Sequence, residues 1–167
     1  MPVQIVLEPF DAANRPVVER LWQLFKHDMS AVTGALPDAE GRFRAHRLPR
    51  YFDGGRDLGF LVRGDRAPVG FCSVLDVGEG SSVMGDFFVV RAARRSGVGS
   101  TAATRLITGR PGSWAVPFQA ANTGAVAFWH GVADALADSA WTEERLPVPG
   151  RPEVPPDVWL RFRVAPA

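Results

Sequence analysis

Residues 87–105 read FFVVRAARRSGVGSTAATR, and this stretch predicts the fold more directly than any other part of the chain. It begins with apolar, β-branched residues typical of a strand, passes through Arg94-Arg95-Ser96-Gly97-Val98-Gly99, and ends in small residues that favour a helix. Glycines let the backbone approach an anion closely, and a helix start presents unpaired N–H groups and a positive dipole end to the same place. The stretch therefore predicts a loop that binds the phosphate of a phosphorylated cofactor.

The size and composition of the chain indicate one globular domain. The sequence has 167 residues, of which 46% are hydrophobic and 22% are charged, values that are ordinary for a globular protein. A chain of this length buries roughly two-thirds of its unfolded surface. We therefore expect a single domain over residues 1–167.

The charge balance and the absence of long apolar runs limit the kinds of partner that the chain is expected to bind. The 19 basic and 18 acidic residues give a formal net charge of +1, which disfavours a broad nucleic-acid surface but leaves a local patch open. No apolar run approaches the roughly 20 residues of a membrane helix, and the N-terminus lacks a basic region followed by an apolar one. The lone Cys72 lies in a strand-like run, where a thiol is usually a small buried hydrophobe. We expect a cytoplasmic protein with no nucleic-acid or membrane partner.

The rest of the chain alternates between strand-like and helical patterns. A strand is expected at 3–8, then a helix capped by Asp11 with apolar residues at helical spacing over 17–25, and a less regular segment 29–55 with a short helix near 44–51. Further strands are expected at 58–63, 68–77, 82–90, 113–118 and 158–164, and further helices at 98–107 and 122–137. Glu143 and Glu144 fit a solvated turn without a functional role. The order predicts a mixed α/β or α+β sheet.

Two motifs in this order resemble those of the GNAT superfamily of acetyl-CoA-dependent N-acetyltransferases. They are Arg94-x-x-Gly97-x-Gly99 after a strand and Asn122-x-x-Ala125-x-x-Phe128-Trp129 at the start of the next helix. Three further stretches are similar to a bacterial subgroup of small predicted acetyltransferases: His27-Asp28-Met29-Ser30, Pro68-Val69-Gly70-Phe71 and Asp86-Phe87-Phe88-Val89-Val90. The resemblance implies a central mixed, mostly antiparallel sheet with splayed middle strands flanked by helices.

The resemblance also implies where acetyl-CoA would bind. The loop amides would hold its pyrophosphate, which assigns cofactor binding to Arg94, Arg95, Ser96, Gly97, Val98, Gly99 and Ser100. The strand backbone at Phe88, Val89 and Val90 would pair with the pantetheine arm, and an N–H near Val89 would stabilise the oxyanion. The second motif adds Asn122, which is also a good helix N-cap, together with Phe128 and Trp129. No metal is expected.

Asp86 is the residue that we expect to receive the proton of the acceptor amine. An aliphatic ammonium has a pKa of about 10.4, so a base or a desolvating pocket must remove its proton. A carboxylate inside the apolar run 83–90 is costly to bury unless it binds a cation or donors. Asp86 precedes Arg94 by the spacing of an aspartate in the similar aminoglycoside 6'-N-acetyltransferases, where it binds or deprotonates the amine. An aspartate at a strand bulge that accepts backbone N–H groups is an equal alternative.

Two further features bear on the acceptor side. His27 and Asp28, at the end of the first helix, are expected to contribute to the acceptor pocket, with a solvated helix end as the alternative. Trp129 occupies the position where many members of the superfamily have a tyrosine that protonates the departing thiolate, and an indole N–H is no usable acid. Tyr51 is the only tyrosine. Because a thiol has a pKa of about 8.5, the thiolate can leave unassisted, take a proton from water or use a group such as His130.

The leading hypothesis is an N-acetyltransferase that acts on a primary amine of a small cationic molecule, with acetyl-CoA as cofactor. A protein or aminoacyl-tRNA acceptor and a non-catalytic acyl-CoA-binding sensor are the alternatives. A homodimer is a habit of the superfamily.

Overall fold

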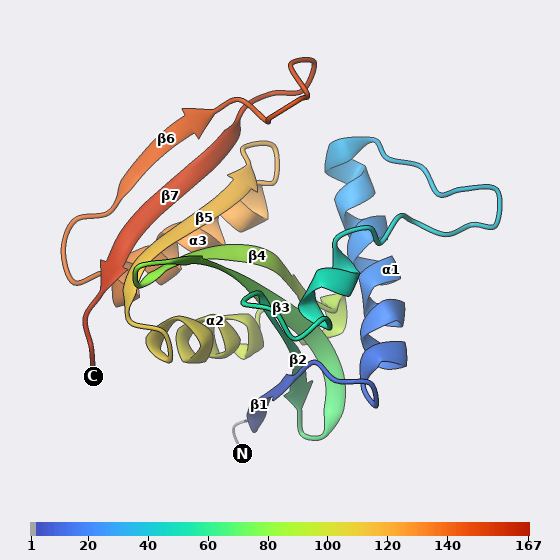
Figure 1. The fold of residues 1–167 in the computed structure, drawn as a ribbon, viewed down its shortest axis with the longest axis horizontal. Helices are drawn as coiled ribbons and strands as arrows, with labels where there is room; N and C mark the ends of the chain where they lie inside the picture. The colour runs from blue at the N-terminus through green and yellow to red at the C-terminus, as the bar shows by residue number, and fades with distance from the viewer. Residues whose placement is uncertain (1–2) are drawn as a thin grey trace. The chain divides into compact units, whose positions relative to one another are not determined.

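The computed structural model describes residues 3–167 and divides the chain into two compact units (Figure 1). The first unit comprises Met1–Leu75 and Gly85–Ala102, and the second comprises Asp76–Met84 and Ala103–Ala167. This division does not test the predicted single domain over residues 1–167, which stays a prediction. No helix within residues 3–167 is both long enough and apolar enough to cross a membrane.

The elements follow the predicted alternation of strands and helices. In chain order they are β1 (Ile5–Pro9), α1 (Arg15–Thr33), the 3-10 helix η1 (Leu48–Tyr51), β2 (Leu58–Gly64), β3 (Ala67–Gly78), β4 (Ser81–Val89), the 3-10 helix η2 (Arg91–Ala93), α2 (Val98–Thr108), β5 (Gly112–Gln119), α3 (Thr123–Leu136), β6 (Thr142–Leu146) and β7 (Asp157–Val164). The predicted mixed α/β class is therefore confirmed. The first helix extends beyond its predicted end, so His27 and Asp28 lie inside α1 rather than at its C-terminus.

Within residues 3–167, seven strands form one mixed sheet in the order β1-β2-β3-β4-β5-β7-β6. The pairs β1·β2, β2·β3, β5·β7 and β6·β7 are antiparallel. The pair β4·β5 is parallel, with Ser81, Ser82 and Val83 opposite Ser113, Trp114 and Ala115. The sheet is therefore mostly antiparallel with one parallel pair, as predicted.

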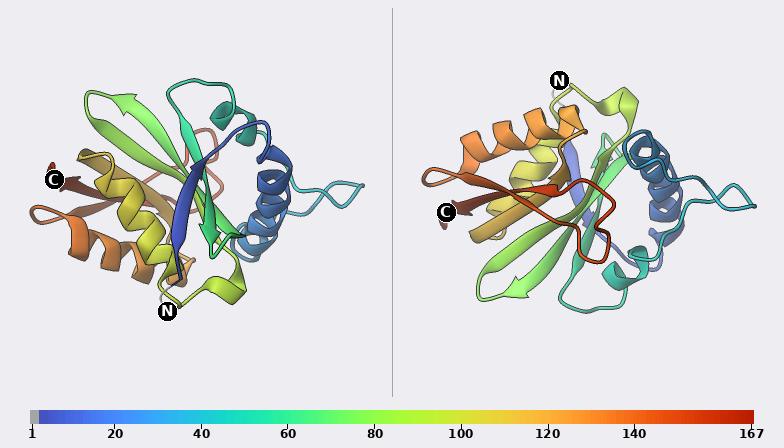
Figure 2. Two further views of the ribbon diagram at one scale, coloured as in Figure 1. Left: turned by 90° about the horizontal axis from the view of Figure 1, so that it is seen from below. Right: turned by 90° about the horizontal axis from the view of Figure 1, so that it is seen from above.

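The prediction of a turn at Glu143 and Glu144 is wrong, because both residues lie in strand β6. Glu143 pairs with Leu160 and Glu144 with Trp159 of the neighbouring strand, and Figures 1 and 2 show β6 and β7 side by side. The Glu144 carboxylate also accepts from Arg161 at 2.7 Å. A short, charged edge strand has almost no hydrophobic alternation, so its pairing with β7 determines its conformation.

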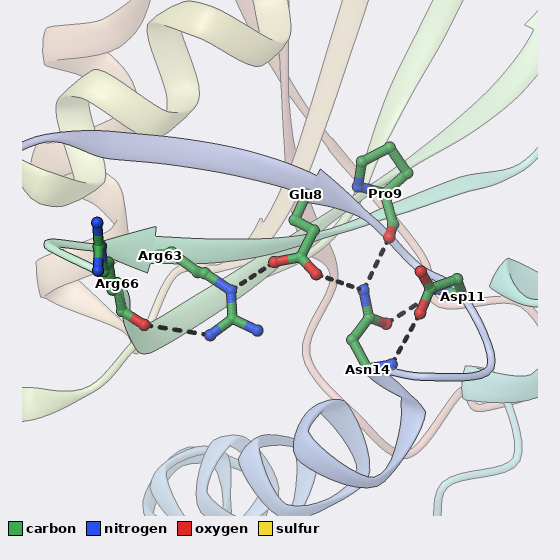
Figure 3. Close-up of polar contacts among 6 residues, drawn as sticks. All are labelled: Glu8, Pro9, Asp11, Asn14, Arg63 and Arg66. Atoms are coloured by element: carbon green, nitrogen blue, oxygen red, sulfur yellow. Dashed lines mark hydrogen bonds and ion pairs between the residues drawn. The ribbon is translucent and has the colours of Figure 1, made fainter.

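The start of α1 also differs from its prediction, because Asn14 and not Asp11 is the N-cap residue. Asp11 and Asn14 bond reciprocally: the Asn14 N–H donates to Asp11 Oδ1 at 2.7 Å, and the Asp11 N–H donates to Asn14 Oδ1 at 3.0 Å (Figure 3). Asn14 Nδ2 donates to the Pro9 carbonyl at 2.8 Å. The Asp11 side chain therefore holds a turn that precedes the helix, which begins at Arg15.

The first unit has a core that joins α1 to its strands. Val18, Leu21 and Trp22 of α1 pack with Leu61 of β2, Phe71 of β3 and Phe88 of β4, and Leu48 and Tyr51 of η1 complete the cluster. The rings of Trp22 and Phe71 stack with their centroids 5.6 Å apart. Burial of these side chains positions α1 and η1 against β4, the strand that leads into the glycine-containing loop.

The second unit is built on β5 and β7, with α3 against both strands. Its buried side chains include Trp114, Val116 and Leu160. Asn122 is the N-cap residue of α3, and its side chain accepts from the Ala125 N–H at 3.2 Å. The predicted capping role of Asn122 is therefore confirmed.

We expect the substitution Asn14→Ala to lower the free energy of unfolding by about 1–3 kcal/mol, because it leaves the partly buried Asp11 N–H and Pro9 carbonyl without their partner. Chemical denaturation with a linear extrapolation measures this change. Ser139→Ala is the control, since the exposed Ser139 hydroxyl donates only to the adjacent Asp138 carboxylate. Equal stabilities of the two variants would contradict the assigned role of Asn14.

Candidate functional site

The glycine-containing loop, residues 94–99, includes two residues with a left-handed backbone conformation. Arg95 and Gly97 have φ values of 60° and 84°, and the second favours glycine. The Thr101 N–H donates to the Gly97 carbonyl at 2.9 Å, so the N–H groups that precede Thr101 have no acceptor within α2. Residues 94–97 are exposed. The loop therefore offers N–H donors at a helix start on the surface of the first unit, where an anion is stabilised.

The Val89 N–H at the end of β4 points away from the neighbouring strand β3. The Phe88 carbonyl oxygen lies against Gly70 of β3, only 2.1 Å from where a side-chain carbon of that residue would sit. The carbonyl and the N–H of one trans peptide point in opposite directions, and no peptide among the described residues is cis. The N–H of the next residue points back toward β3, because the Val90 N–H donates to the Val69 carbonyl of that strand at 2.8 Å. Val89 therefore directs its N–H away from β3, while its predicted part in stabilising the oxyanion stays a prediction.

Arg94 connects this peptide to helix α1. Its Nε donates to the Val89 carbonyl at 2.8 Å, and its guanidinium carbon lies 5.8 Å from the centre of the Phe88 ring. Its Nη2 also forms an ion pair with Asp28 of α1. The conformation of the Arg94 side chain is thus fixed at both ends, by the strand and by the helix.

Asp28 also binds the other arginine that flanks the loop. Arg91 Nε donates to Asp28 Oδ1 at 3.0 Å. Burial acts to raise the pKa of Asp28, but the hydrogen bonds from Arg94 and Arg91 outweigh it and hold this pKa below its usual range. Asp28 is therefore an ionised anchor between α1 and the loop, while its predicted part in the acceptor pocket stays a prediction.

Asp86 is buried in β4 with a partner on each carboxylate oxygen. Its Oδ1 accepts from Arg47 Nη2 and its Oδ2 accepts from the Tyr51 hydroxyl at 3.0 Å. The Asp86 N–H donates to Ser73 Oγ of β3 at 2.7 Å. The side chain of Asp86 is only 1% exposed, whereas that of Arg47 is 48% exposed. The buried carboxylate is thus partnered by one half-exposed cation and one buried hydroxyl.

Burial dominates the protonation equilibria of this cluster. It raises the pKa of Asp86 above its ordinary value even though Arg47, Tyr51 and Lys26 all favour the charged form. It also raises the pKa of Tyr51, to which the negative charge of Asp86 adds. Tyr51 is therefore a neutral donor to Asp86 at neutral pH. Gly85 leaves room for this contact, because a side-chain carbon there would lie 2.7 Å from the Tyr51 hydroxyl oxygen.

Lys26 and His27 are consecutive residues of α1 that lie near the segment following that helix. Burial and the Arg47 guanidinium lower the pKa of Lys26, and the Asp86 charge acts in the opposite direction. His27 is exposed, and its ring meets the Phe43 ring edge-on with 6.4 Å between centroids. Both side chains therefore interact with the segment between α1 and β2.

Three predicted cofactor residues belong to the second unit. Asn122 caps α3, and Phe128 and Trp129 lie within that helix, with their rings 4.8 Å apart and nearly perpendicular. Trp129 is buried. His130 bonds Glu143 at 2.6 Å and stacks on Trp141 with 4.9 Å between centroids. The roles of these residues toward a cofactor stay predictions.

The sequence did not predict two sets of contacts: those of Asp86 with Arg47, Tyr51 and Ser73, and those of Asp28 with Arg91 and Arg94. One signal was present, since a carboxylate in an apolar strand requires a cation or donors. It did not identify which residues supply them, because Arg47 and Tyr51 lie 39 and 35 positions away. The predicted burial of Cys72 is confirmed, and burial raises the pKa of its thiol to about 12.

Comparison with known proteins shows that the chain has the fold of GNAT-family acetyltransferases. An acetyltransferase from Thermus thermophilus superposes with a TM-score of 0.71 and 16% identity, covering 98% of this chain and 99% of that one. A GNAT family acetyltransferase from Elizabethkingia anophelis with acetyl-CoA bound gives a TM-score of 0.64 and 11% identity, covering 96% and 98%. The ribosomal-protein-S18-alanine N-acetyltransferase from Escherichia coli gives 0.62 and 12%, covering 98% and 96%. No protein-family model and no curated protein sequence matches the chain.

We expect Gly70→Ala to destabilise the protein by about 1–3 kcal/mol, because the new methyl group would overlap the Phe88 carbonyl oxygen and force the strands apart. Gly55→Ala is the matched control, since a side-chain carbon there meets nothing within 4 Å and its φ is not positive. Thermal and denaturant unfolding of both variants measure the difference. A Gly70→Ala protein as stable as Gly55→Ala would contradict the close contact between β3 and the Phe88 peptide.

Proposed function

We propose that this chain is an acyltransferase of the GNAT type, which transfers the acetyl group of acetyl-CoA to a primary amine of a small molecule. The observation that carries the proposal is the continuous stretch from Phe88 to Ser100. Within the first unit it combines a Val89 N–H that points away from β3 with a surface loop of N–H donors at the start of α2. The fold shared with GNAT-family acetyltransferases supports this proposal.

The residues of this stretch fit acetyl-CoA in chemistry and order. The cofactor supplies an acetyl group activated as a thioester. The N–H groups of residues 95–100 bind its pyrophosphate, and the positive charge of Arg95 favours the same anion. The Val89 N–H donates to the acyl oxygen, where negative charge develops during attack by the amine. Asn122, Phe128 and Trp129 are assigned to the cofactor by the resemblance alone.

Arg94 serves as a positioning residue in this proposal. It binds the carbonyl of Val89, the residue whose N–H stabilises the developing charge, and Asp28 fixes Arg94 in turn. A donor that is already oriented before the reaction needs no reorganisation when charge develops. The network from Asp28 through Arg94 to Val89 therefore contributes to the rate rather than to cofactor affinity.

Asp86 has two roles open to it, and each makes a different demand on Arg47. As the base it exchanges Arg47 for the acceptor ammonium, the cation that the sequence analysis expects at this carboxylate. As an anchor it keeps Arg47 and Tyr51 and holds η1 against β4. We propose the first role, because Arg47 is half exposed and can move into water at modest cost, whereas Tyr51 is buried.

The acceptor could instead be a protein, as the name of the Escherichia coli neighbour, ribosomal-protein-S18-alanine N-acetyltransferase, states for that enzyme. A non-catalytic acyl-CoA sensor is the second alternative. Thiol release from acetyl-CoA, measured with a panel of small amines and with peptides, tests all three. Release with small amines supports the proposal, whereas binding of acetyl-CoA without release for any acceptor would remove both enzymatic functions. A homodimer and a cytoplasmic location stay predictions.

We expect Arg94→Ala to lower kcat about 10–100-fold while the dissociation constant for acetyl-CoA changes much less. Arg91→Ala is the matched control, because Arg91 also pairs with Asp28, whereas the bond to the Val89 carbonyl comes from Arg94. Calorimetry with acetyl-CoA and steady-state thiol release separate binding from rate. Equal losses of kcat in the two variants would contradict the positioning role of Arg94.

We expect kcat/KM of the unaltered protein to fall as the pH falls through the pKa of Asp86, because a base must be ionised to accept a proton. Since burial raises this pKa, the fall occurs at a higher pH than the ordinary carboxyl value of about 3.9. Asp86→Asn should abolish acceptor-dependent turnover and preserve acetyl-CoA affinity. Full turnover in the Asp86→Asn variant would assign Asp86 the anchoring role alone.

A further inference from the structure

The segment that approaches Asp86 is strongly basic. Residues 42–50 read RFRAHRLPR, which places four arginines and His46 within nine positions, and all five of these residues are exposed. Figure 2 shows the preceding part of the chain extending away from α1 and returning toward η1. The overall charge balance of the chain therefore hides a local excess of positive charge on the first unit.

Hydrogen bonds to α1 hold this basic segment in a defined position. Trp22 Nε1 donates to the Arg44 carbonyl at 3.1 Å. The Gln23 side chain bonds the Phe43 backbone twice: it donates to the Phe43 carbonyl at 2.9 Å and accepts from the Phe43 N–H at 2.7 Å. The side chain of Arg47, three residues after Arg44, then reaches Asp86. The fold therefore determines the position of the backbone that leads to Arg47.

Positive charge exceeds negative charge around Asp86. Arg47 forms the ion pair with Asp86, and Lys26 is close enough for its charge to interact with both of them. Within the described residues, Lys26 has no ion pair of its own. The Asp28 carboxylate of α1 is held by Arg91 and Arg94, and the Asp57 carboxylate pairs with Arg50. Arg47 is thus ion-paired with the buried Asp86 carboxylate, and the charge of Lys26 interacts with the same carboxylate.

We propose that the acceptor carries an anionic group, a carboxylate or a phosphate, in addition to its amine, and that Arg47 exchanges Asp86 for that group when the acceptor binds. This inference rests on the proposed function. The acceptor ammonium then takes the place of Arg47 at Asp86, and Lys26 adds a second positive charge beside the bound anion. Every charge that the exchange separates gains a new partner of opposite sign.

The exchange follows from the unequal exposure of the two members of the ion pair. The Asp86 carboxylate is buried and always requires a cation or donors, so Arg47 leaves only when an ammonium replaces it. The guanidinium has a planar fork of donors that matches a carboxylate or a phosphate with two parallel hydrogen bonds. A simple amine satisfies Asp86 alone, whereas a zwitterionic or phosphorylated amine satisfies both groups.

The test compares amines in matched pairs that differ in the anionic group. Thiol release from acetyl-CoA is measured with glycine against glycinamide, β-alanine against β-alaninamide, and O-phosphoethanolamine against ethanolamine. We expect kcat/KM to be at least about tenfold higher for the anionic member of one pair, and the pair that responds distinguishes carboxylate from phosphate. Conversion to the amide lowers the pKa of the amine, which acts against the expected preference and makes the test conservative.

Substitutions assign the preference to its residues. Lys26→Met and Arg47→Lys should each reduce the kcat/KM ratio of the anionic amine to its matched partner. The first removes a positive charge, and the second removes the planar fork of guanidinium donors. Arg20→Met is the control, since it removes an exposed positive charge from α1 at a residue without a role in the site. It should leave the ratio unchanged.

Failure of this inference is distinguishable from failure of the proposed function. Equal turnover within every pair, or turnover with peptides or aminoacyl-tRNA alone, would overturn the anionic acceptor while leaving acetyl transfer in place. Binding of acetyl-CoA without thiol release for any amine would instead remove the proposed function. A preference that survives both Lys26→Met and Arg47→Lys would also overturn the assignment to these cations.

Discussion

The burial of a carboxylate inside strand β4 is the constraint on which the organisation of the first unit depends. An ionised group in an apolar strand is unfavourable unless donors from elsewhere reach it. For Asp86 those donors come from Arg47 and Tyr51, at the two ends of one short segment that contains η1. The need to satisfy one side chain thus fixes an otherwise irregular segment against the sheet. Gly85 provides the room that the Tyr51 hydroxyl requires.

Helix α1 contacts both the basic segment that leads to Asp86 and the arginines that precede helix α2. Through Trp22 and Gln23 it holds the basic segment that leads to Asp86. Through Asp28, about one and a half turns farther along, it holds Arg91 and Arg94, which both precede the glycine of the loop before α2. The acceptor side and the cofactor side of the proposed reaction are therefore positioned by one rigid element, whose apolar face is fixed by packing on Phe71 and Phe88. Precision between two reacting groups requires such shared support.

The parts of the fold that were predictable are those with local signals. Hydrophobic periodicity located the helices and the long strands, and the glycine and arginine pattern after β4 located the loop, because both depend on residues that are close in sequence. Strand β6 was missed, since a charged edge strand is determined by its partner strand. The partners of Asp86 and Asp28 were missed for the same reason. The sequence indicated that a buried carboxylate needs donors, but only the fold brings Arg47 and Tyr51 to it.

The structure changes what the charge of Asp86 implies about the acceptor. From sequence, an isolated carboxylate in a pocket favours a cationic acceptor. In the folded chain that carboxylate already has Arg47 as a counter-ion, and Lys26 adds a further positive charge, so the region has an excess of positive charge. An acceptor that is only a cation must displace Arg47 against the repulsion of both basic residues. An acceptor that brings its own negative charge replaces each broken contact with another, and this balance favours an amine that is also an anion.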